Sequence, residues 1–291
     1  MASLLNAILN ATFISALYAI IAIGFTLIFG VGGVLNFAHG ALLTVGAFAA
    51  YIVANPTQYG MSPWLGLLVA PVATAVVGGV LYKGVVRYVE GKPVTLLILT
   101  FVIGFFVQHA LRIFVTNQPI SVTQPIGGQT MLLGQEIQRW DVAIFVISWA
   151  ILGAVFFFVN YTKTGQAILA VSMTKKGSSL VGIDSEQINL YTWVMAAGFA
   201  GIAGALLMMK QTGNWNMGTS PLILAFSIVI LGGLGSIRGS IVGAYVIGFV
   251  ETFTVAFVPD GSKLTGLASL VLLVVFLLVK PEGLFGREAA E

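Results

Sequence analysis

The chain has 291 residues, of which 58% are hydrophobic and only 8% are charged, and its formal net charge is +3. A typical soluble domain carries about 25% charged residues, so this composition excludes a soluble enzyme and leaves no stretch for an extramembrane catalytic domain. The absence of cysteine excludes a disulfide framework and a thiolate site. The composition predicts an all-α polytopic membrane protein in which residues 1–291 form one transmembrane domain.

Nine apolar runs follow one another along the chain, and each is predicted to be a helix because backbone in lipid must satisfy its own hydrogen bonds. The runs cover 5–29, 40–55, 63–82, 94–115, 141–160, 187–209, 221–235, 241–258 and 264–280. A crossing needs about 20 residues, so the short run at 221–235 is predicted to be a half-helix or a re-entrant segment. The prediction is a bundle of eight or nine transmembrane helices. The start of the chain lacks the basic region of a cleaved signal peptide, so the first run is interpreted as a retained span.

Three groups of basic residues predict how these helices are oriented. The groups are Lys83, Arg87 and Lys92; Lys163, Lys175 and Lys176; and Lys280 and Arg287. Lys and Arg concentrate in cytoplasmic loops, and a slight basic excess therefore indicates such loops rather than a nucleic-acid surface. With nine spans, all three groups lie inside if the N-terminus is outside and the C-terminus is cytoplasmic. The polar loop at 116–140 is then extracytoplasmic and the segment at 161–186 is cytoplasmic.

The segment at 161–186 combines a short apolar patch, a basic turn and a second apolar element. This pattern predicts one or two short helices that lie across the inner membrane face and dock on a soluble protein. An ordinary amphipathic surface loop is the alternative.

The first apolar region is interrupted between Gly30 and Gly40, where four glycines occur. Each glycine costs about 1 kcal/mol relative to alanine inside a helix, so a regular helix is not expected there. Transporters use broken helices at membrane depth to form binding sites, and Asn36 and His39 would offer side-chain hydrogen bonds beside freed backbone groups. The alternative is a tight turn between two spans, with Asn36 and His39 as helix caps.

A similar glycine pattern recurs between residues 232 and 244. Gly235, Gly239 and Gly243 are four residues apart, which predicts one helix face that packs closely against a neighbour. If the chain crosses the membrane nine times, both glycine segments lie on the same side of the membrane. This placement is the one expected if the two segments arose by a weak internal duplication. A third stripe of small residues, which includes Gly201, is predicted to serve helix packing.

Ionisable residues within the predicted spans are few, and such groups usually face the interior of a bundle or an aqueous path. They are His109, Arg112 and Glu251, with Lys210 at an edge. Glu251 needs a partner or a water-filled cavity; the alternatives are a proton relay, a structural ion pair and a side chain that reaches the outer interface. Gln108, His109 and Arg112 share one helical face by their spacing.

Motifs for nucleotide or metal chemistry are absent from the sequence. It contains no G-x-x-x-x-G-K-[ST] phosphate loop and no H-E-x-x-H zinc motif. The segment from Gly218 to Pro221 loosely resembles the surroundings of an intramembrane serine nucleophile, but both histidines precede it and neither is placed as an obvious base.

Three segments occur in order over nearly the whole chain: residues 33–43 (GVLNFAHGALL), 231–239 (LGGLGSIRG) and 280–286 (KPEGLFG). Together they resemble a known family, the LivH-type branched-chain amino acid permeases of ABC importers. The first segment resembles the family signature, the second resembles its glycine motif, in which proline is common at the position of Arg238, and the third is similar to its C-terminal ending.

The resemblance implies half of a translocation pathway in the inner or plasma membrane, paired with a second related permease. It further implies two cytoplasmic ATPase subunits, which use the ATP, an extracytoplasmic binding protein, and no cofactor or metal on this chain. The candidate pathway residues are Gly33, Asn36, Phe37, His39, Gly40 and Glu251. The candidate ATPase-coupling residues are Gly165, Ala167, Lys175, Lys176, Leu180, Gly182 and Ile183. Residues 169–176 depart from the arginine and acidic residue that the family often carries there.

Three alternatives remain. A urea or short-amide importer of the same family would share every motif quoted above. A secondary, ion-coupled carrier would use Glu251 and His109 as a relay without ATPase partners. An intramembrane hydrolase built on Ser220 is the enzymatic alternative.

Overall fold

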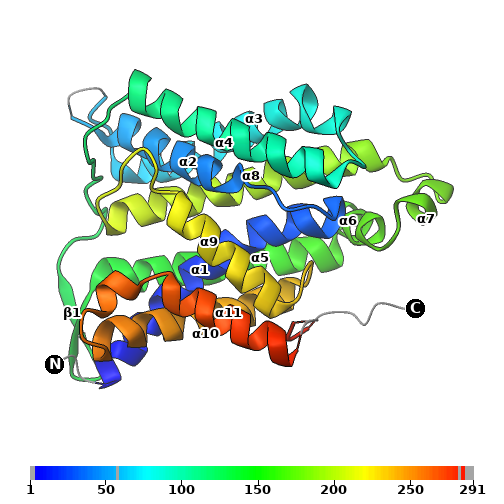
Figure 1. Ribbon diagram of the computed structural model, residues 1–291. Helices are drawn as coiled ribbons and strands as arrows, with labels where there is room; N and C mark the ends of the chain where they lie inside the picture. Colours follow the sequence, from blue (N-terminus) through cyan, green and yellow to red (C-terminus); the bar gives the residue numbers. More distant parts are fainter. Residues whose placement is uncertain (1–3, 57–58, 281–282, 286–291) are drawn as a thin grey trace.

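The computed structural model describes residues 4–56, 59–280 and 283–285 (Figure 1). Each predicted apolar run corresponds to one helix. The helices are α1 (Leu4–Gly32), α2 (His39–Ala54), α3 (Pro63–Gly84), α4 (Pro93–Phe114), α5 (Arg139–Tyr161), α6 (Lys163–Met173), α7 (Lys175–Leu180), α8 (Ser185–Lys210), α9 (Thr219–Gly232), α10 (Ile237–Phe257) and α11 (Leu267–Val279). Two short 3-10 turns, Val86–Tyr88 and Gly261–Leu264, and the strands β1 (Gln129–Leu132) and β2 (Gln135–Gln138) complete the described elements.

Six helices in the described ranges are long and apolar enough to cross a membrane: α1, α3, α4, α5, α8 and α10. The other three apolar helices, α2, α9 and α11, have 16, 14 and 13 residues. At 1.5 Å per residue, a 14-residue helix extends about 21 Å, which is shorter than a hydrocarbon core of about 30 Å. The run predicted at 221–235 is therefore a short helix, and the number of crossings beyond six stays a prediction.

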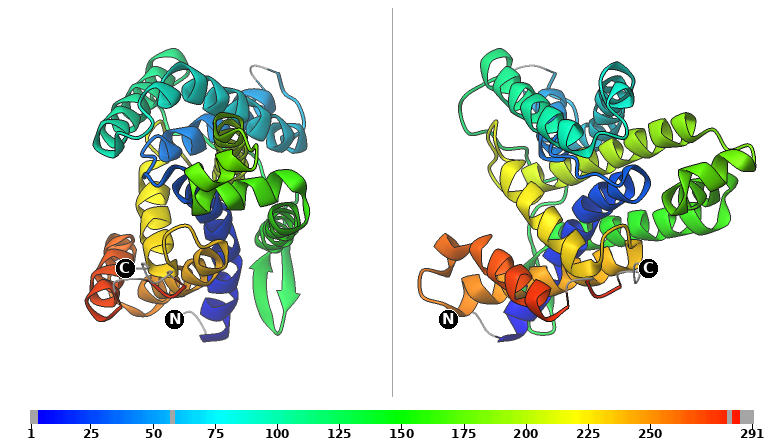
Figure 2. Two further views of the ribbon diagram at one scale, coloured as in Figure 1. Left: turned by 90° about the vertical axis from the view of Figure 1, so that its right-hand side faces the viewer. Right: turned by 45° about the vertical axis from the view of Figure 1, so that its right-hand side comes forward.

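Helices α1 and α8 form the interior of the bundle. In their most apolar 18-residue stretches, 78% and 72% of the residues are buried, whereas the corresponding value for α4 is 17%. Helices α2 and α3 pack on α8, while α5, α9 and α10 pack on α1. Among the described elements, α4 makes its main contact with α2, and the rest of its apolar surface is exposed. The two views in Figure 2 show α3 and α4 on one side of the bundle and α10 and α11 on the other.

The two ends of the bundle differ in charge and structure. Helices α6 and α7 protrude at one end, where residues 85–92 and the end of α11 also lie (Figure 1). We call this the basic end, because it carries Lys83, Arg87, Lys92, Lys175 and Lys176. The first two predicted basic groups are thus on the same side. Lys280 of the third group is at this end too, and Arg287 lies outside the described residues.

The opposite end, which we call the hairpin end, carries the start of α1 and an antiparallel hairpin formed by β1 and β2. Leu133 and Gly134 connect the strands with φ angles of 50° and 76°. Two successive positive φ angles are typical of the two-residue turn that matches strand twist. The hairpin lies within the predicted polar loop at 116–140, where no strand was predicted.

Small residues bring the interior helices into close contact. A Cβ atom on Gly46 would lie 2.3 Å from Gly201 Cα, and one on Gly201 would lie 2.7 Å from the carbonyl oxygen of Ala70. Helices α2, α3 and α8 therefore meet at Gly201 through backbone contacts, which is how membrane helices associate without a hydrophobic driving force between them.

Candidate functional site

A break separates α1 from α2. Helix α1 ends at Gly32, Gly33 has a φ of +64°, and the chain stays non-helical until α2 begins at His39. Within the break, Asn36 Oδ1 accepts a hydrogen bond from the backbone N–H of Ala38 at 3.0 Å. The side chain of Asn36 thus stabilises the turn into α2, while His39 makes no capping bond and points into the bundle.

His39 is fully buried beneath the break. Its Nε2 lies 3.1 Å from the carbonyl oxygen of Ile21, and because a carbonyl only accepts, this nitrogen carries the proton. The ring meets Phe25 edge-on, with centroids 5.7 Å apart. Gly24 makes room for it, since a Cβ atom there would lie 2.8 Å from His39 Cε1.

Two polar atoms at the break have no hydrogen-bond partner among the described residues. They are Nδ1 of His39 and Nδ2 of Asn36, and both atoms are buried. A buried polar atom without a partner costs about 1–3 kcal/mol, so such atoms are uncommon in folded proteins. The break therefore concentrates two donor or acceptor groups that a ligand or another conformation can satisfy.

Neighbouring helices hold the break from two sides. The backbone N–H of Phe37 donates to Thr100 Oγ1 of α4 at 3.2 Å, and the ring of Phe37 meets Phe101 with centroids 6.3 Å apart. On the other side, a Cβ atom on Gly40 would lie 2.5 Å from the carbonyl oxygen of Gly218, which immediately precedes α9. A change in the position of α4 would therefore act directly on the break.

A second break separates α9 from α10, and it corrects one expectation. Gly235 lies two residues before the start of α10 and has a φ of +80°, so it does not share a helix face with Gly239 and Gly243. Ser236 caps α10 by accepting the N–H of Gly239 at 3.0 Å. On α10, a Cβ atom on Gly239 would lie 2.0 Å from the carbonyl oxygen of Gly232. A glycine on α10 and the end of α9 thus make direct backbone contact.

The two glycine segments, about 200 residues apart in sequence, touch at the basic end. A Cβ atom on Gly30 would lie 3.7 Å from Gly235 Cα. A cavity of about 620 Å³ opens beside this contact, a size typical of small-molecule sites. Its lining includes Phe29, Gly33, Asn160, Leu169, Ser172 and Arg238. The lining from α5 and α6 was not predicted, because no sequence pattern connects those helices to the glycine segments.

Helix α6 docks against both interior helices. Thr162 caps it by accepting the N–H of Gly165 at 3.0 Å. A Cβ atom on Gly165 would lie 2.1 Å from the carbonyl oxygen of Phe158, so glycine permits the sharp turn from α5 into α6. The buried side chains of Ile168 and Val171 form a cluster with residues of α1 and α8, and Ala167 and Ile183 pack at its edge. The predicted short helices at 161–186 are therefore present and attached to the core.

Helix α7 and its C-terminal turn project away from the bundle. Leu180 and Val181 are 81% and 75% exposed, and Lys175 and Lys176 are exposed beside them. Gly182, with a φ of +81°, ends the helix. The tip therefore offers apolar and charged groups side by side for contact with another molecule.

Glu251 lies away from the break and caps α11. It is 3% exposed, and its carboxylate accepts hydrogen bonds from the N–H groups of Gly266, at 2.9 and 3.0 Å, and of Ser269, at 3.2 Å. A carboxylate at a helix N-terminus satisfies free N–H groups and complements the helix dipole. This contact supplies the partner that the sequence required for Glu251.

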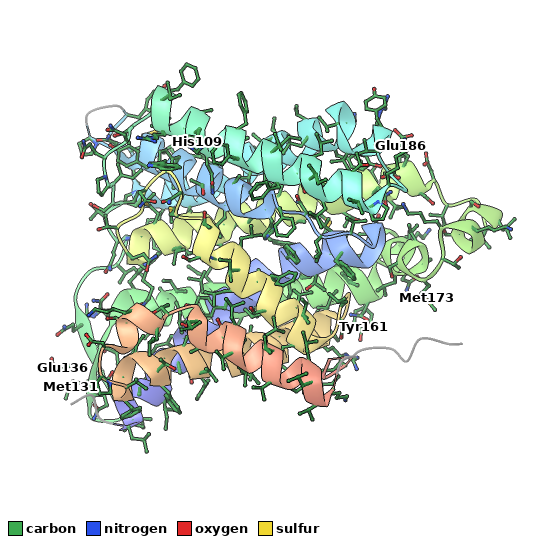
Figure 3. All side chains as sticks on the ribbon, in the orientation of Figure 1. His109, Met131, Glu136, Tyr161, Met173 and Glu186 are labelled. Atoms are coloured by element: carbon green, nitrogen blue, oxygen red, sulfur yellow. The ribbon has the colours of Figure 1, made fainter. Side chains whose placement is uncertain are left out.

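His109 and Arg112 share a partner at the hairpin end of α4. The ring of Trp215 lies 4.8 Å from the His109 ring and 5.0 Å from the Arg112 guanidinium, measured to ring centroids. Figure 3 shows His109 on α4 near this end, whereas Glu186 and Met173 lie at the basic end. Helices α4 and α10 lie on opposite sides of the bundle in Figures 1 and 2, so the structure does not bring His109 and Glu251 together. Lys210 pairs with Asp141 at the start of α5.

The sequence of this chain matches a protein family and several known proteins. The family described as "Branched-chain amino acid transport system / permease component" matches residues 7–280. The permease protein LivH of a high-affinity branched-chain amino acid transport system in Escherichia coli is 28% identical, over 99% of this chain and 97% of LivH. BraD of Pseudomonas aeruginosa is 28% identical over the same shares, and the ribose import permease RbsC of Haemophilus influenzae is 22% identical over 84% of this chain and 76% of RbsC.

A solved structure shares the arrangement of the helices. PsaBC from Streptococcus pneumoniae, in complex with Fab, superposes with a TM-score of 0.50 and 13% identity, covering 95% of this chain and 92% of that chain. At this identity the likeness concerns the fold alone.

Proposed function

The chain belongs to the family of permease components of branched-chain amino acid transport systems, and we propose that it is the membrane-spanning permease subunit of an ATP-driven importer of branched-chain amino acids. The observation that carries the proposal is the family match over residues 7–280, together with relatives of that function that cover 99% of the chain. The two breaks, whose glycine segments touch at Gly30 and Gly235, agree with this role, since transporters place their substrate path at such breaks.

The basic end faces the cytoplasm in this proposal. Cytoplasmic loops collect Lys and Arg, and the residues that define the basic end, together with Lys280, lie here. The N-terminus is then outside, the C-terminus is inside, and the nine apolar helices alternate in direction across the inner or plasma membrane as one transmembrane domain, with α2, α9 and α11 as short crossings.

The protruding helices α6 and α7 bind the partner ATPase subunits. The exposed side chains of Leu180 and Val181 offer an apolar contact, and Lys175 and Lys176 offer charge beside it. The opposite face of α6 is fixed to α1 through Ile168. A displacement of α6 by the ATPase subunits therefore also displaces the end of α1, immediately before the break. A second related permease and an extracytoplasmic binding protein complete the transporter.

Transport proceeds by alternating access around the break. ATP binding and hydrolysis by the partners shift the equilibrium between two states, and a shift requires different affinities of the nucleotide for those states. The free hydrogen-bonding atoms of Asn36 and His39 solvate the charged groups of the amino acid as it passes, with Phe37 and the flanking Gly33 and Gly40 forming the surrounding path. Most of the selectivity resides in the binding protein, so the path itself binds weakly.

Two experiments test this function. In vesicles that contain the complete transporter, excess unlabelled leucine should abolish uptake of labelled leucine, and excess urea should leave it unchanged; the reverse result would identify a urea or short-amide importer. Deletion of residues 165–183 should abolish co-purification of the ATPase subunits. Retention of the ATPases by the deleted chain would exclude α6 and α7 as their binding site.

A further inference from the structure

Glu90 lies in the loop between α3 and α4, and its carboxylate contacts three other elements. Its Oε1 accepts hydrogen bonds from Tyr82 Oη of α3 at 2.8 Å and from Asn189 Nδ2 of α8 at 2.7 Å. Its Oε2 lies 3.5 Å from Nζ of Lys175, the first residue of α7. One side chain therefore connects the loop to the bundle and to the ATPase-binding segment.

The two oxygens of Glu90 are held with different strength. Tyr82 and Asn189 are 0% and 3% exposed, and their bonds to Oε1 are short. Hydrogen bonds to a charged group are about twice as strong as neutral ones, so this side is a fixed anchor. The side chain of Lys175 is 44% exposed, and its charge contact with Oε2 connects the anchored carboxylate to α7.

Glu90 is rigidly connected to the start of α4. The backbone N–H of Lys92 donates to the carbonyl oxygen of Val89 at 3.1 Å, and Gly91 has a φ of +82°, so residues 89–92 form a tight turn. Pro93 begins α4, and its ring fixes the backbone at the first helical position. Any displacement of the Glu90 carboxylate is therefore passed to α4 rather than absorbed by a flexible loop.

A hydrophobic cluster beneath Glu90 extends this connection to the break. Tyr82 packs there with Trp193 of α8 and Leu96 of α4, and Val34 of the break lies against the same cluster. A cavity of only about 20 Å³ remains between them, so the cluster is close-packed. Close-packed interiors transmit displacements. Farther along α4, Thr100 bonds the backbone of the break itself.

We propose that Glu90 is a positioning residue that makes the start of α4, and through it the break between α1 and α2, follow the movement of α7. The proposal rests on the transport function inferred above. When the ATPase subunits displace α7, the contact between Lys175 and Glu90 carries that displacement to α4. Without the contact, α7 moves while α4 stays in place, and ATP is hydrolysed without transport.

The test compares uptake with hydrolysis in the complete transporter, reconstituted in proteoliposomes. For Glu90→Gln and Lys175→Ala, leucine-stimulated ATP hydrolysis should persist while leucine uptake per ATP falls about twofold to thirtyfold, the range typical of mutations in a coupling network. Lys175→Arg should restore the ratio, because it keeps the charge opposite Glu90. A brace that only stabilises the fold would lower hydrolysis and uptake together.

Arg87 and Glu186 provide a matched control. They form an ion pair of 3.1 Å at the same end of the bundle, with side chains that are 40% and 62% exposed. The pair joins the turn at Val86–Tyr88 to α8 and involves no residue of α7, so Arg87→Ala should leave uptake per ATP unchanged. Equal ratios in Arg87→Ala, Glu90→Gln and Lys175→Ala would overturn the proposal. Wild-type vesicles that take up leucine without ATP would instead overturn the transport function.

A distance measurement gives a second readout. The chain contains no cysteine, so Val94→Cys at the start of α4 and Phe157→Cys on α5 can be spin-labelled selectively. Both side chains are exposed, at 70% and 63%. The ATP-dependent change in the label distance should occur in the otherwise wild-type chain and disappear with Glu90→Gln. A change of the same size in both chains would show that α4 moves independently of Glu90.

Discussion

Replacing Gly239 by alanine tests whether the close contact of α9 and α10 supports the fold. The added Cβ atom would lie 2.0 Å from the carbonyl oxygen of Gly232 and 2.7 Å from its carbonyl carbon. Both atoms belong to the backbone, so no side chain can rotate away. The helices must separate until the contact reaches at least 3.4 Å, the lower limit of ordinary van der Waals contact.

The expected cost is at the upper end of the range for overpacking, about 2–3 kcal/mol. For a domain of this size, that cost lowers the melting temperature by about 4–12 °C, measured by tryptophan fluorescence of the detergent-solubilised protein. Gly153→Ala is the matched control, because the Cβ atom of residue 153 meets nothing within 4 Å. It should leave the melting temperature unchanged or raise it slightly, since alanine is the better helix former.

Equal melting temperatures of Gly239→Ala and Gly153→Ala would show that the close contact of α9 and α10 does not support the fold. A further check uses Gly232→Ala, which places its Cβ atom 2.3 Å from the carbonyl oxygen of Gly239. Because both substitutions force apart the same contact, the double variant should be less destabilised than the two single effects added together.

Three further predictions concern other parts of the molecule. Glu251→Ala should lower stability by about 1–2 kcal/mol because it removes the cap of α11, and Glu251→Gln should lower it less; loss of uptake by the glutamine variant at unchanged melting temperature would favour a proton relay. Ile168→Ala should destabilise the chain by about 2–4 kcal/mol and detach α6. Leu180→Ser should leave the melting temperature unchanged and weaken co-purification of the ATPase subunits. If the Leu180→Ser chain retained as much ATPase as the wild type, the tip of α7 would not be the binding site. Gly24→Ala should displace His39 and reduce leucine uptake more than Gly153→Ala does; equal uptake by the two variants would show that the position of His39 does not matter.

The positions of the apolar helices could be predicted from the sequence because in lipid the length of an apolar run largely determines its structure. The predicted run at 40–55, for example, corresponds to α2 at His39–Ala54. The contact between the two glycine segments, by contrast, follows from tertiary packing. Gly235 was expected on a helix because its spacing to Gly239 is four, yet its positive φ belongs to the turn before α10.

The polar contacts could not be predicted, because they join residues far apart in sequence. Glu90 and Asn189 are 99 positions apart, and no periodic pattern connects them. A weak signal was present: Glu90 is the single acidic residue in a loop that otherwise carries basic groups. Glu251 was identified as a buried charge in need of a partner, but its partners are backbone N–H groups, which every sequence offers equally.

The hairpin of β1 and β2 was missed for a related reason. Its strands are four residues long and consist mainly of Gln, Thr and Glu, so they lack the alternation of apolar residues that predicts a strand. The turn that joins them depends on positive φ angles at Leu133 and Gly134, and leucine gives no indication of such a conformation.

The proposed ATP-driven import is tested most directly by measuring leucine uptake by proteoliposomes that contain the complete transporter, with ATP on the side of the ATPase subunits or with a proton gradient alone. We expect uptake with ATP and none with the gradient, and a strong reduction when Asn36 and His39 are both replaced by alanine in a complex that still hydrolyses ATP. Uptake driven by the gradient, or full uptake by the double variant, would contradict the proposal.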